Sequence, residues 1–262
     1  MTVQDSSAGL GMPIETRFGQ PLPRLELRWR GHPLFAGITT RELDFRRVRT
    51  NAGTAQGALE AWAGSHFRAV VGASQVHGTE LFRADEVAPG TVQVEARDGL
   101  LVNTAGILLT VSVADCVPAI VYAPLAGAIA LVHAGWRGVA GGILPAAVAA
   151  LGDEYSAQPG ECMAYWGPAI GPCCFPVGEE VVESIRAAGV GPDTEGWLAD
   201  GRDGPRVDLR GALTCQAVSL GLSRASIVSS PECTYCHLER FHSHRRDGTD
   251  SGRMVFFAGL PG

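Results

Sequence analysis

Cys116 and His133 are two residues whose types and spacing predict metal or nucleophilic chemistry. Each stands at the end of an apolar run, since residues 117–123 follow the cysteine and residues 128–132 precede the histidine. An antiparallel hairpin that turns directly after Pro124 would place the two side chains opposite each other, with β-carbons about 4.5–5.5 Å apart. A thiolate and an imidazole at that separation can bind one ion, because Zn–S bonds are about 2.3 Å and Zn–N bonds about 2.0–2.1 Å long.

Pro118 favours this register. It lacks an N–H group, so it fits opposite Leu131 in a pair whose N–H would point away from the partner strand. The alternative is structural: a cysteine next to an apolar strand is often a small buried hydrophobic residue, and a histidine at a strand end is often a hydrogen-bonded boundary residue. Spacing alone leaves both interpretations open.

The residues that follow His133 can bind an anion. They read Ala-Gly-Trp-Arg-Gly and lead into a predicted helix over 139–151. A strand, a glycine loop and a helix N-terminus together present free backbone N–H groups, and Arg137 adds a fork suited to phosphate or carboxylate. The alternative is that Gly135 and Gly138 only permit a tight turn and that Arg137 is solvated.

His77 lies between a predicted strand and Gly78. This arrangement is typical of a loop in which backbone and imidazole both approach a ligand closely, although a solvated histidine in a capped turn gives the same pattern.

The C-terminal part holds a second group of potential ligands. Five of them fall within twelve residues: Cys233, Cys236, His237, His242 and His244. Their spacing is too tight for the common zinc-finger patterns, so a structural zinc there stays a secondary hypothesis. Cys173 and Cys174 are adjacent, and on an extended chain they point to opposite faces, so we expect them to pack rather than share an ion.

Composition limits the class of protein. The chain has 262 residues, a net charge of −6 and a sequence pI of about 5.6, which gives no global electrostatic reason to bind nucleic acid or an anionic membrane. Seven cysteines and an N-terminus without a basic and then apolar pattern favour a reducing cytoplasm over secretion. No apolar run is long enough to cross a membrane.

The elements that position these residues follow from hydrophobic periodicity. We expect residues 1–24 to be poorly ordered or edge structure and residues 25–262 to form a single catalytic domain. The predicted strands are 25–29, 34–38, 67–71, 91–95, 100–102, 107–113, 117–123, 128–132, 163–166, 225–229 and 254–258. The predicted helices are 56–65, 139–151, 179–188 and 209–222, the last with Asp208 as its N-cap.

Several independent motifs occur in order: His77, Ala-Asp-Cys, His-Ala-Gly-Trp-Arg-Gly, Gly-Pro-Ala-Ile-Gly-Pro-Cys-Cys and Arg-Arg-Asp-Gly. Over residues 65–260 the chain closely resembles the YfiH-like family, also called the laccase-domain or multicopper polyphenol oxidoreductase family. Members are often described as purine nucleoside phosphorylases with adenosine deaminase activity. The resemblance implies a single α+β domain of layered mixed sheets flanked by helices.

The resemblance also implies the site. The family's zinc ligands fall on His77, Cys116 and His133, which leave a fourth position open as catalytic zinc sites do. Such an ion lowers the pKa of water toward about 7, which suits deamination, and Asp115 or Asp98 is a candidate for the proton shuttle. Phosphorolysis of a purine nucleoside also needs a site for phosphate. The candidates are Arg41, Arg137, Arg245 and Arg246.

Two other functions compete with this one. A copper-loaded polyphenol oxidase is the family's older label, but a multicopper centre needs several His-x-His pairs, and this chain has seven histidines with one such pair. Copper could still enter an N/S site if it is loaded artificially. A peptidoglycan editing factor would instead use Cys116 as nucleophile and His133 as base.

Overall fold

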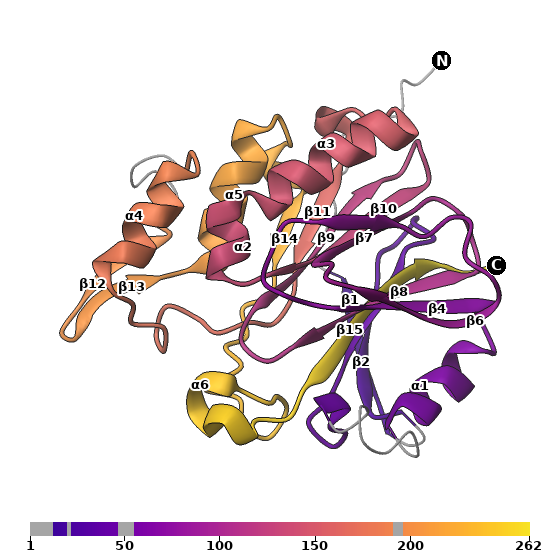
Figure 1. Ribbon diagram of the computed structural model, residues 1–262, viewed down its shortest axis with the longest axis horizontal. Helices are drawn as coiled ribbons and strands as arrows, with labels where there is room; N and C mark the ends of the chain where they lie inside the picture. Colours follow the sequence, from indigo (N-terminus) through magenta and orange to yellow (C-terminus); the bar gives the residue numbers. More distant parts are fainter. Residues whose placement is uncertain (1–12, 20–21, 47–54, 191–195) are drawn as a thin grey trace.

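Two β-sheets packed face to face form the centre of the computed structural model, which describes residues 13–19, 22–46, 55–190 and 196–262 (Figure 1). The first sheet has seven strands in the order β1-β2-β3-β15-β8-β4-β6. Their bounds are β1 Ile14–Phe18, β2 Arg24–Arg28, β3 Phe35–Thr39, β4 Ala69–Ser74, β6 Gly90–Glu95, β8 Ile107–Val113 and β15 Met254–Leu260.

The second sheet has six strands in the order β14-β11-β9-β10-β7-β5. Their bounds are β5 Leu81–Arg83, β7 Gly99–Val102, β9 Val117–Ala123, β10 Ala128–Ala134, β11 Met163–Trp166 and β14 Ile227–Ser229. A separate hairpin pairs β12 Leu198–Gly201 with β13 Gly204–Val207. Parallel and antiparallel pairs occur in both main sheets, so the fold is mixed α+β as expected.

Helices cover the two outer faces (Figure 1). Helix α1 Ala55–Ala63 packs on the seven-stranded sheet, where Leu59 joins Leu108 and Phe257 in one apolar cluster. On the six-stranded sheet lie α2 Trp136–Gly141, α3 Ile143–Tyr155 and α5 Leu209–Ser219, and α4 Glu179–Ala187 packs beside α2 and the hairpin of β12 and β13. The short α6 His244–Asp247 precedes the last strand.

Alternation along β9 explains the layers. Val117, Ala119 and Val121 face the helices, whereas Ile120 and Tyr122 face the other sheet. Successive side chains of a strand point to opposite faces, and this strand is apolar on both because both are covered.

Most predicted elements are present. Two predictions are wrong: the extent of the helix over 139–151 and the register of the hairpin that precedes it. Asp208 caps α5 as expected by accepting a hydrogen bond from the Arg210 N–H. The helix predicted over 139–151 instead begins at Trp136 and breaks at Gly142, whose φ of 86° ends α2 and starts α3. Of the segment 1–24, residues 1–12, 20 and 21 lie outside the described residues, and β1 forms a sheet edge.

The predicted hairpin register is wrong by two residues. His133 pairs with Pro118 rather than with Cys116, because the turn spans four residues from Pro124 to Gly127 instead of two. Gly127 has a φ of 57° and donates its N–H to the Pro124 carbonyl, a conformation that glycine adopts without strain. A shift of two keeps every side chain on its face, so Cys116 and His133 are diagonal neighbours instead of opposed ones.

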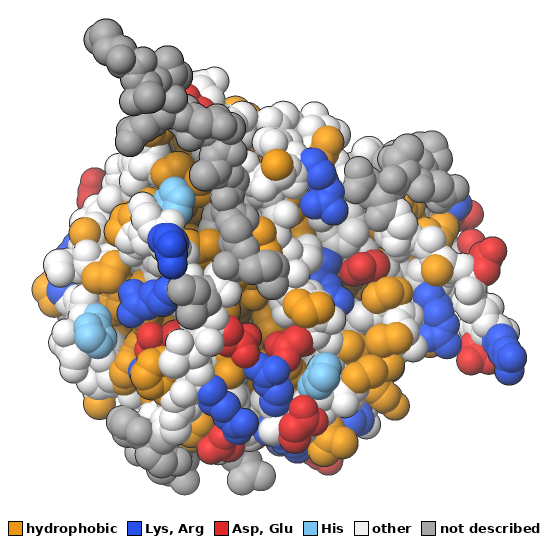
Figure 2. Space-filling model, turned by 180° about the vertical axis from the view of Figure 1, so that it is seen from behind, with side chains coloured by type: hydrophobic (Ala, Val, Ile, Leu, Met, Phe, Trp, Pro, Cys, Tyr) orange, Lys and Arg blue, Asp and Glu red, His pale blue; other side chains and the backbone are white. Residues whose placement is uncertain are grey.

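On the face shown in Figure 2, acidic and basic side chains are interspersed, with no extended region of basic charge. In the described part of the chain, every helix is too short or too polar to cross a bilayer.

Candidate metal centre and its cleft

His77, Cys116 and His133 converge from three separate elements. His77 lies in the loop after β4, Cys116 directly precedes β9, and His133 is the penultimate residue of β10. Their possible ligand atoms all lie within 4.8 Å of one another, and the Cys116 Sγ is 3.9 Å from the His77 Nε2. The two imidazole rings are 4.8 Å apart and nearly perpendicular, at 75°. Three donors of this kind can share one ion.

Asp98, which precedes β7, orders two of these donors. Its carboxylate is fully buried and accepts the backbone N–H groups of Val76, His77 and Gly78 at 3.0, 3.0 and 2.7 Å. It also accepts a hydrogen bond from the His133 Nδ1 at 2.8 Å. Because a carboxylate only accepts, this bond fixes the tautomer and leaves the His133 Nε2 lone pair free for a metal.

The electrostatics of the centre favour charged forms. Burial raises the pKa of Asp98, but the bonds from His133 and the backbone N–H groups outweigh it and lower that pKa. Burial also opposes a thiolate, yet the neighbouring charge and hydrogen bond of His133 lower the pKa of Cys116 to about 6. Against its own burial, His133 has its pKa raised to about 9 by the Cys116 thiolate and by Asp98.

The backbone at His77 and Gly135 is shaped around the three donors. His77 has a φ of 61°, in the left-handed region that a non-glycine residue adopts only when its surroundings hold it there. Gly135 lies beside the cluster: a Cβ on it would stand 2.9 Å from the Cys116 Sγ and 3.0 Å from the His77 Cδ2. A larger residue at this position would therefore collide with the donors, so Gly135 does more than permit a tight turn.

Asp115 has a structural place. Its φ is 86°, and its carboxylate accepts Thr234 Oγ1 at 2.6 Å, Ser243 Oγ at 3.1 Å and the Arg245 N–H at 2.6 Å. These bonds tie the C-terminal segment to the residue that precedes Cys116. Sequence reasoning named Asp115 and Asp98 as proton-shuttle candidates, and in the structure each carboxylate is occupied by several donors.

A cleft of about 760 Å³ opens beside the three donors. His77, Cys116 and His244 are among the residues that line it. The Arg137 guanidinium stacks over the Trp136 ring at 4.4 Å. The lining also includes Arg245 and Phe175, whose ring lies 5.0 Å from the Arg245 guanidinium. The cleft thus combines aromatic faces with two cations.

The four predicted arginines separate into two groups. Arg137 and Arg245 line the cleft. Arg246 is outside its lining and donates to the Thr234 and Tyr235 carbonyls, both at 3.0 Å, while pairing with Asp247. Arg41 is also outside it and binds the Leu238 carbonyl.

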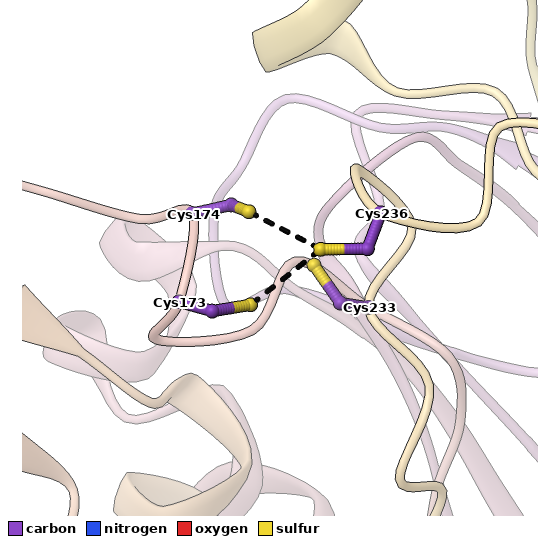
Figure 3. A group of neighbouring side chains, drawn as sticks. All are labelled: Cys173, Cys174, Cys233 and Cys236. Atoms are coloured by element: carbon purple, nitrogen blue, oxygen red, sulfur yellow. Dashed lines mark hydrogen bonds between the residues drawn. The ribbon is translucent and has the colours of Figure 1, made fainter.

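The C-terminal ligand group is composed differently from the predicted one. Cys233 and Cys236 gather with Cys173 and Cys174, as Figure 3 shows. The predicted His237, His242 and His244 are not in this group: His237 pairs with Glu239, His242 with the Leu43 carbonyl, and His244 lines the cleft.

The expectation that Cys173 and Cys174 point apart is wrong. The chain turns here instead of running extended, with the Cys174 N–H donated to the Gly171 carbonyl at 3.0 Å. Both thiols therefore point toward Cys236.

Proteins of known sequence and structure resemble this chain over most of its length. The model of the family described as multi-copper polyphenol oxidoreductase laccase matches residues 43–261. Over 217 residues the chain is 35% identical to "Purine nucleoside phosphorylase YlmD" of Geobacillus stearothermophilus, covering 80% of this chain and 79% of the relative. Over 181 residues it is 36% identical to "Adenosine deaminase RL5" of an unknown prokaryotic organism, covering 69% of this chain and 68% of the relative. The crystal structure of YlmD matches with a TM-score of 0.78 at 30% identity, covering 95% of this chain and 99% of that one.

Proposed function

The chain belongs to the multi-copper polyphenol oxidoreductase laccase family, as its motifs indicate, and on that premise we propose that it is a zinc-dependent purine nucleoside phosphorylase that also deaminates adenosine. One observation carries the proposal: the donors His77, Cys116 and His133 form one group, and two of them, His77 and Cys116, line a cleft large enough for a small ligand. The named activities of the two relatives supply the substrate class.

The donor set fits zinc. Two imidazoles and one thiolate are ligands that zinc accepts, and three protein ligands leave one position open to the cleft. Gly135 keeps the space beside the donors clear, and Asp98 holds His133 in the tautomer that a metal requires. When bound, zinc would supply a Lewis acid at this wall of the cleft.

The other cleft residues would bind the nucleoside and phosphate. Arg137 and Arg245 are the two predicted arginines that face the cleft, and guanidinium groups bind phosphate through paired N–H donors. Trp136 and Phe175 provide aromatic faces on which a purine can stack. In this assignment Arg246 and Arg41 support the C-terminal segment instead of touching substrate, because both donate to its backbone carbonyls.

The test is conversion of inosine to hypoxanthine and ribose 1-phosphate by the purified full chain. Turnover should require phosphate, and His133→Ala should abolish it. His66→Ala is the matched control, because His66 is exposed and lies outside both the cleft lining and the donor group. Hypoxanthine formed without phosphate, or full activity of His133→Ala, would contradict the assignment.

A second candidate is a thiol enzyme. The lowered pKa of Cys116 and the raised pKa of His133 are what a nucleophile and base pair needs. Activity that survives complete metal removal and is lost on alkylation of Cys116 would favour this function. Activity that disappears with the metal and returns with zinc would favour the phosphorylase.

The copper oxidase receives less support from the donor groups. In the described residues, which include all seven histidines, two groups of three or more potential ligands occur. One holds two histidines and a cysteine, and the other holds four cysteines. A three-copper cluster needs many more imidazoles than either provides. Metal content of protein made without added copper is the direct measurement.

A further inference from the structure

We propose that the chain carries a second, structural zinc site whose four ligands are Cys173, Cys174, Cys233 and Cys236 (Figure 3). The site shares no residue with the group formed by His77, Cys116 and His133.

The sulfur positions fit a tetrahedral ion. All four sulfurs lie within 4.8 Å of one another, with Cys173 Sγ 3.8 Å and Cys174 Sγ 3.4 Å from Cys236 Sγ. Zn–S bonds of about 2.3 Å in a tetrahedron put neighbouring sulfurs about 3.8 Å apart. A disulfide needs about 2.05 Å, so these spacings match a shared ion and not a bonded pair.

The fold brings the two cysteine pairs together for a topological reason. Strands β11 and β14 are parallel neighbours, and their pairing continues beyond the strands through an isolated bridge between Ala169 and Cys233. The Thr234 N–H donates to the Ala169 carbonyl at 3.0 Å. Both segments therefore leave the same edge of the sheet, and each presents a cysteine pair a few residues later, 173–174 on one and 233 with 236 on the other.

Local contacts suit a bound thiolate. The Gly171 N–H points at the Cys233 Sγ at 3.2 Å, and the Cys236 N–H also donates to that sulfur. Four thiolates around one Zn²⁺ carry a net charge of −2, and two cations stand next to the ligand loops. Arg206 donates to the Cys173 carbonyl at 2.7 Å, and Arg246 donates to the Tyr235 carbonyl at 3.0 Å.

Ligand type and exposure distinguish this site from a catalytic one. Four cysteines fill a tetrahedral shell and leave no position for substrate, as in structural zinc sites. Cys173 and Cys236 are exposed, so an ion can enter from solvent, whereas Cys233 is buried and anchors the site to the core.

The site joins two segments that both line the cleft. The loop that carries Cys173 and Cys174 continues to Phe175, and the segment that carries Cys233 and Cys236 continues to Arg245. An ion shared by the two would hold these cleft walls at a fixed separation.

The first experiment is elemental analysis of the full chain purified under reducing conditions with Zn²⁺ as the only added metal. The wild type should hold two zinc ions per chain, and Cys236→Ser and His77→Ala should hold one each. Cys162→Ser is the matched control and should keep two, because Cys162 belongs to neither group and its thiol donates to the Gln158 carbonyl, as a hydroxyl also could. A wild type with one zinc, lost in His77→Ala and retained in Cys236→Ser, would overturn the proposal.

The second experiment covers the case in which Cys236→Ser fails to fold. Cys174→His keeps a zinc ligand at its position and should retain two ions, since Cys₃His sites are common. After replacement of zinc by Co²⁺, its thiolate-to-metal charge-transfer absorption should fall below that of the wild type, and Cys162→Ser should match the wild type. An unchanged spectrum, or a wild type in which these four cysteines form disulfides after purification under reducing conditions, would refute the site.

Discussion

The two cysteine-containing groups of this protein differ in ways that separate chemistry from structure. The group of His77, Cys116 and His133 mixes nitrogen with sulfur, lies against a cleft and has one carboxylate, Asp98, ordering it. The group around Cys236 is all sulfur, has two exposed members, Cys173 and Cys236, and is ordered by backbone N–H groups. An open three-donor set can offer an ion to a substrate, whereas a closed four-donor set can only hold chain segments together.

The largest expected effect is on activity and comes from the group of His77, Cys116 and His133, called the mixed group below. Cys116→Ala removes one of three ligands at the cleft wall, so phosphorolysis of inosine should fall by at least about 10³-fold, given the size of metal-assisted rate effects. Zinc content should fall from two ions to one. Steady-state kinetics and elemental analysis on the same preparation measure both. If Cys116→Ala keeps its activity, the mixed group is not the catalytic one and the comparison fails.

A smaller effect should follow from changing the residue that orders the ligands. Asp98→Asn replaces an acceptor of four hydrogen bonds with a group that can donate toward Val76 or His133, so we expect kcat/KM to fall about 10–100-fold, as for other partners of metal ligands. Zinc should also leave the mixed group faster in the presence of a chelator, which a fluorescent zinc indicator can follow.

Asp85→Asn is the matched control for that substitution. Its carboxylate also accepts two backbone N–H groups, from Asn103 and Thr104, and the Tyr155 hydroxyl, but Asp85 belongs neither to the donor group nor to the cleft lining. It should lower thermal stability by a similar amount with little effect on zinc release. Equal zinc release in the two variants would mean that Asp98 acts through general stability alone.

The space beside the mixed group gives the next effect. Gly135→Ala places a methyl group 2.9 Å from the Cys116 Sγ, a distance at which one of them must move. We expect zinc affinity at the mixed group, and activity at limiting zinc, to fall on the order of tenfold, about 1.4 kcal/mol. Competition with a chelator measures the affinity. Gly57→Ala in α1, where a Cβ meets nothing within 4 Å, should change neither quantity.

The sequence predicted the layers better than the register. The strands β9 and β10 are apolar over most of their seven residues, so the hydrophobic pattern predicts them, and Asp208 is recognisable as a helix N-cap. The sequence does not distinguish the four-residue turn over residues 124–127 from a two-residue turn. A glycine in the left-handed conformation, as at Gly127, and a glycine that follows a shorter turn give the same pattern. The hairpin of β12 and β13 is short and half exposed, so its pattern carries little signal.

The site was predictable in its ligands and not in its support. Cys116 and His133 stayed on one face because the register error was an even number of residues. Asp98 showed its role only in three dimensions, since its bonds to His133 and the His77 loop span more than twenty residues. The adjacent Cys173 and Cys174 do not by themselves predict the four-cysteine group, because on an extended chain their side chains point apart; the turn that brings them together is favoured by Gly171 and Pro172 before them.

The smallest effect on catalysis should come from the all-sulfur group. Cys236→Ser frees the loop before Phe175 from the segment before Arg245, so the cleft walls lose a fixed separation without losing a cleft residue. We expect KM for nucleoside to rise on the order of threefold, with a smaller change in kcat. In free energy this loss of binding is well below the 1.4 kcal/mol that corresponds to a tenfold change. Thermal unfolding should shift more than activity does, because an ion bound only by the native state stabilises it by mass action. Differential scanning calorimetry with and without added zinc measures the shift in unfolding temperature, and steady-state kinetics measure the change in activity. A large loss of kcat with an unchanged unfolding temperature would place chemistry in the all-sulfur group and reverse the roles of the two groups.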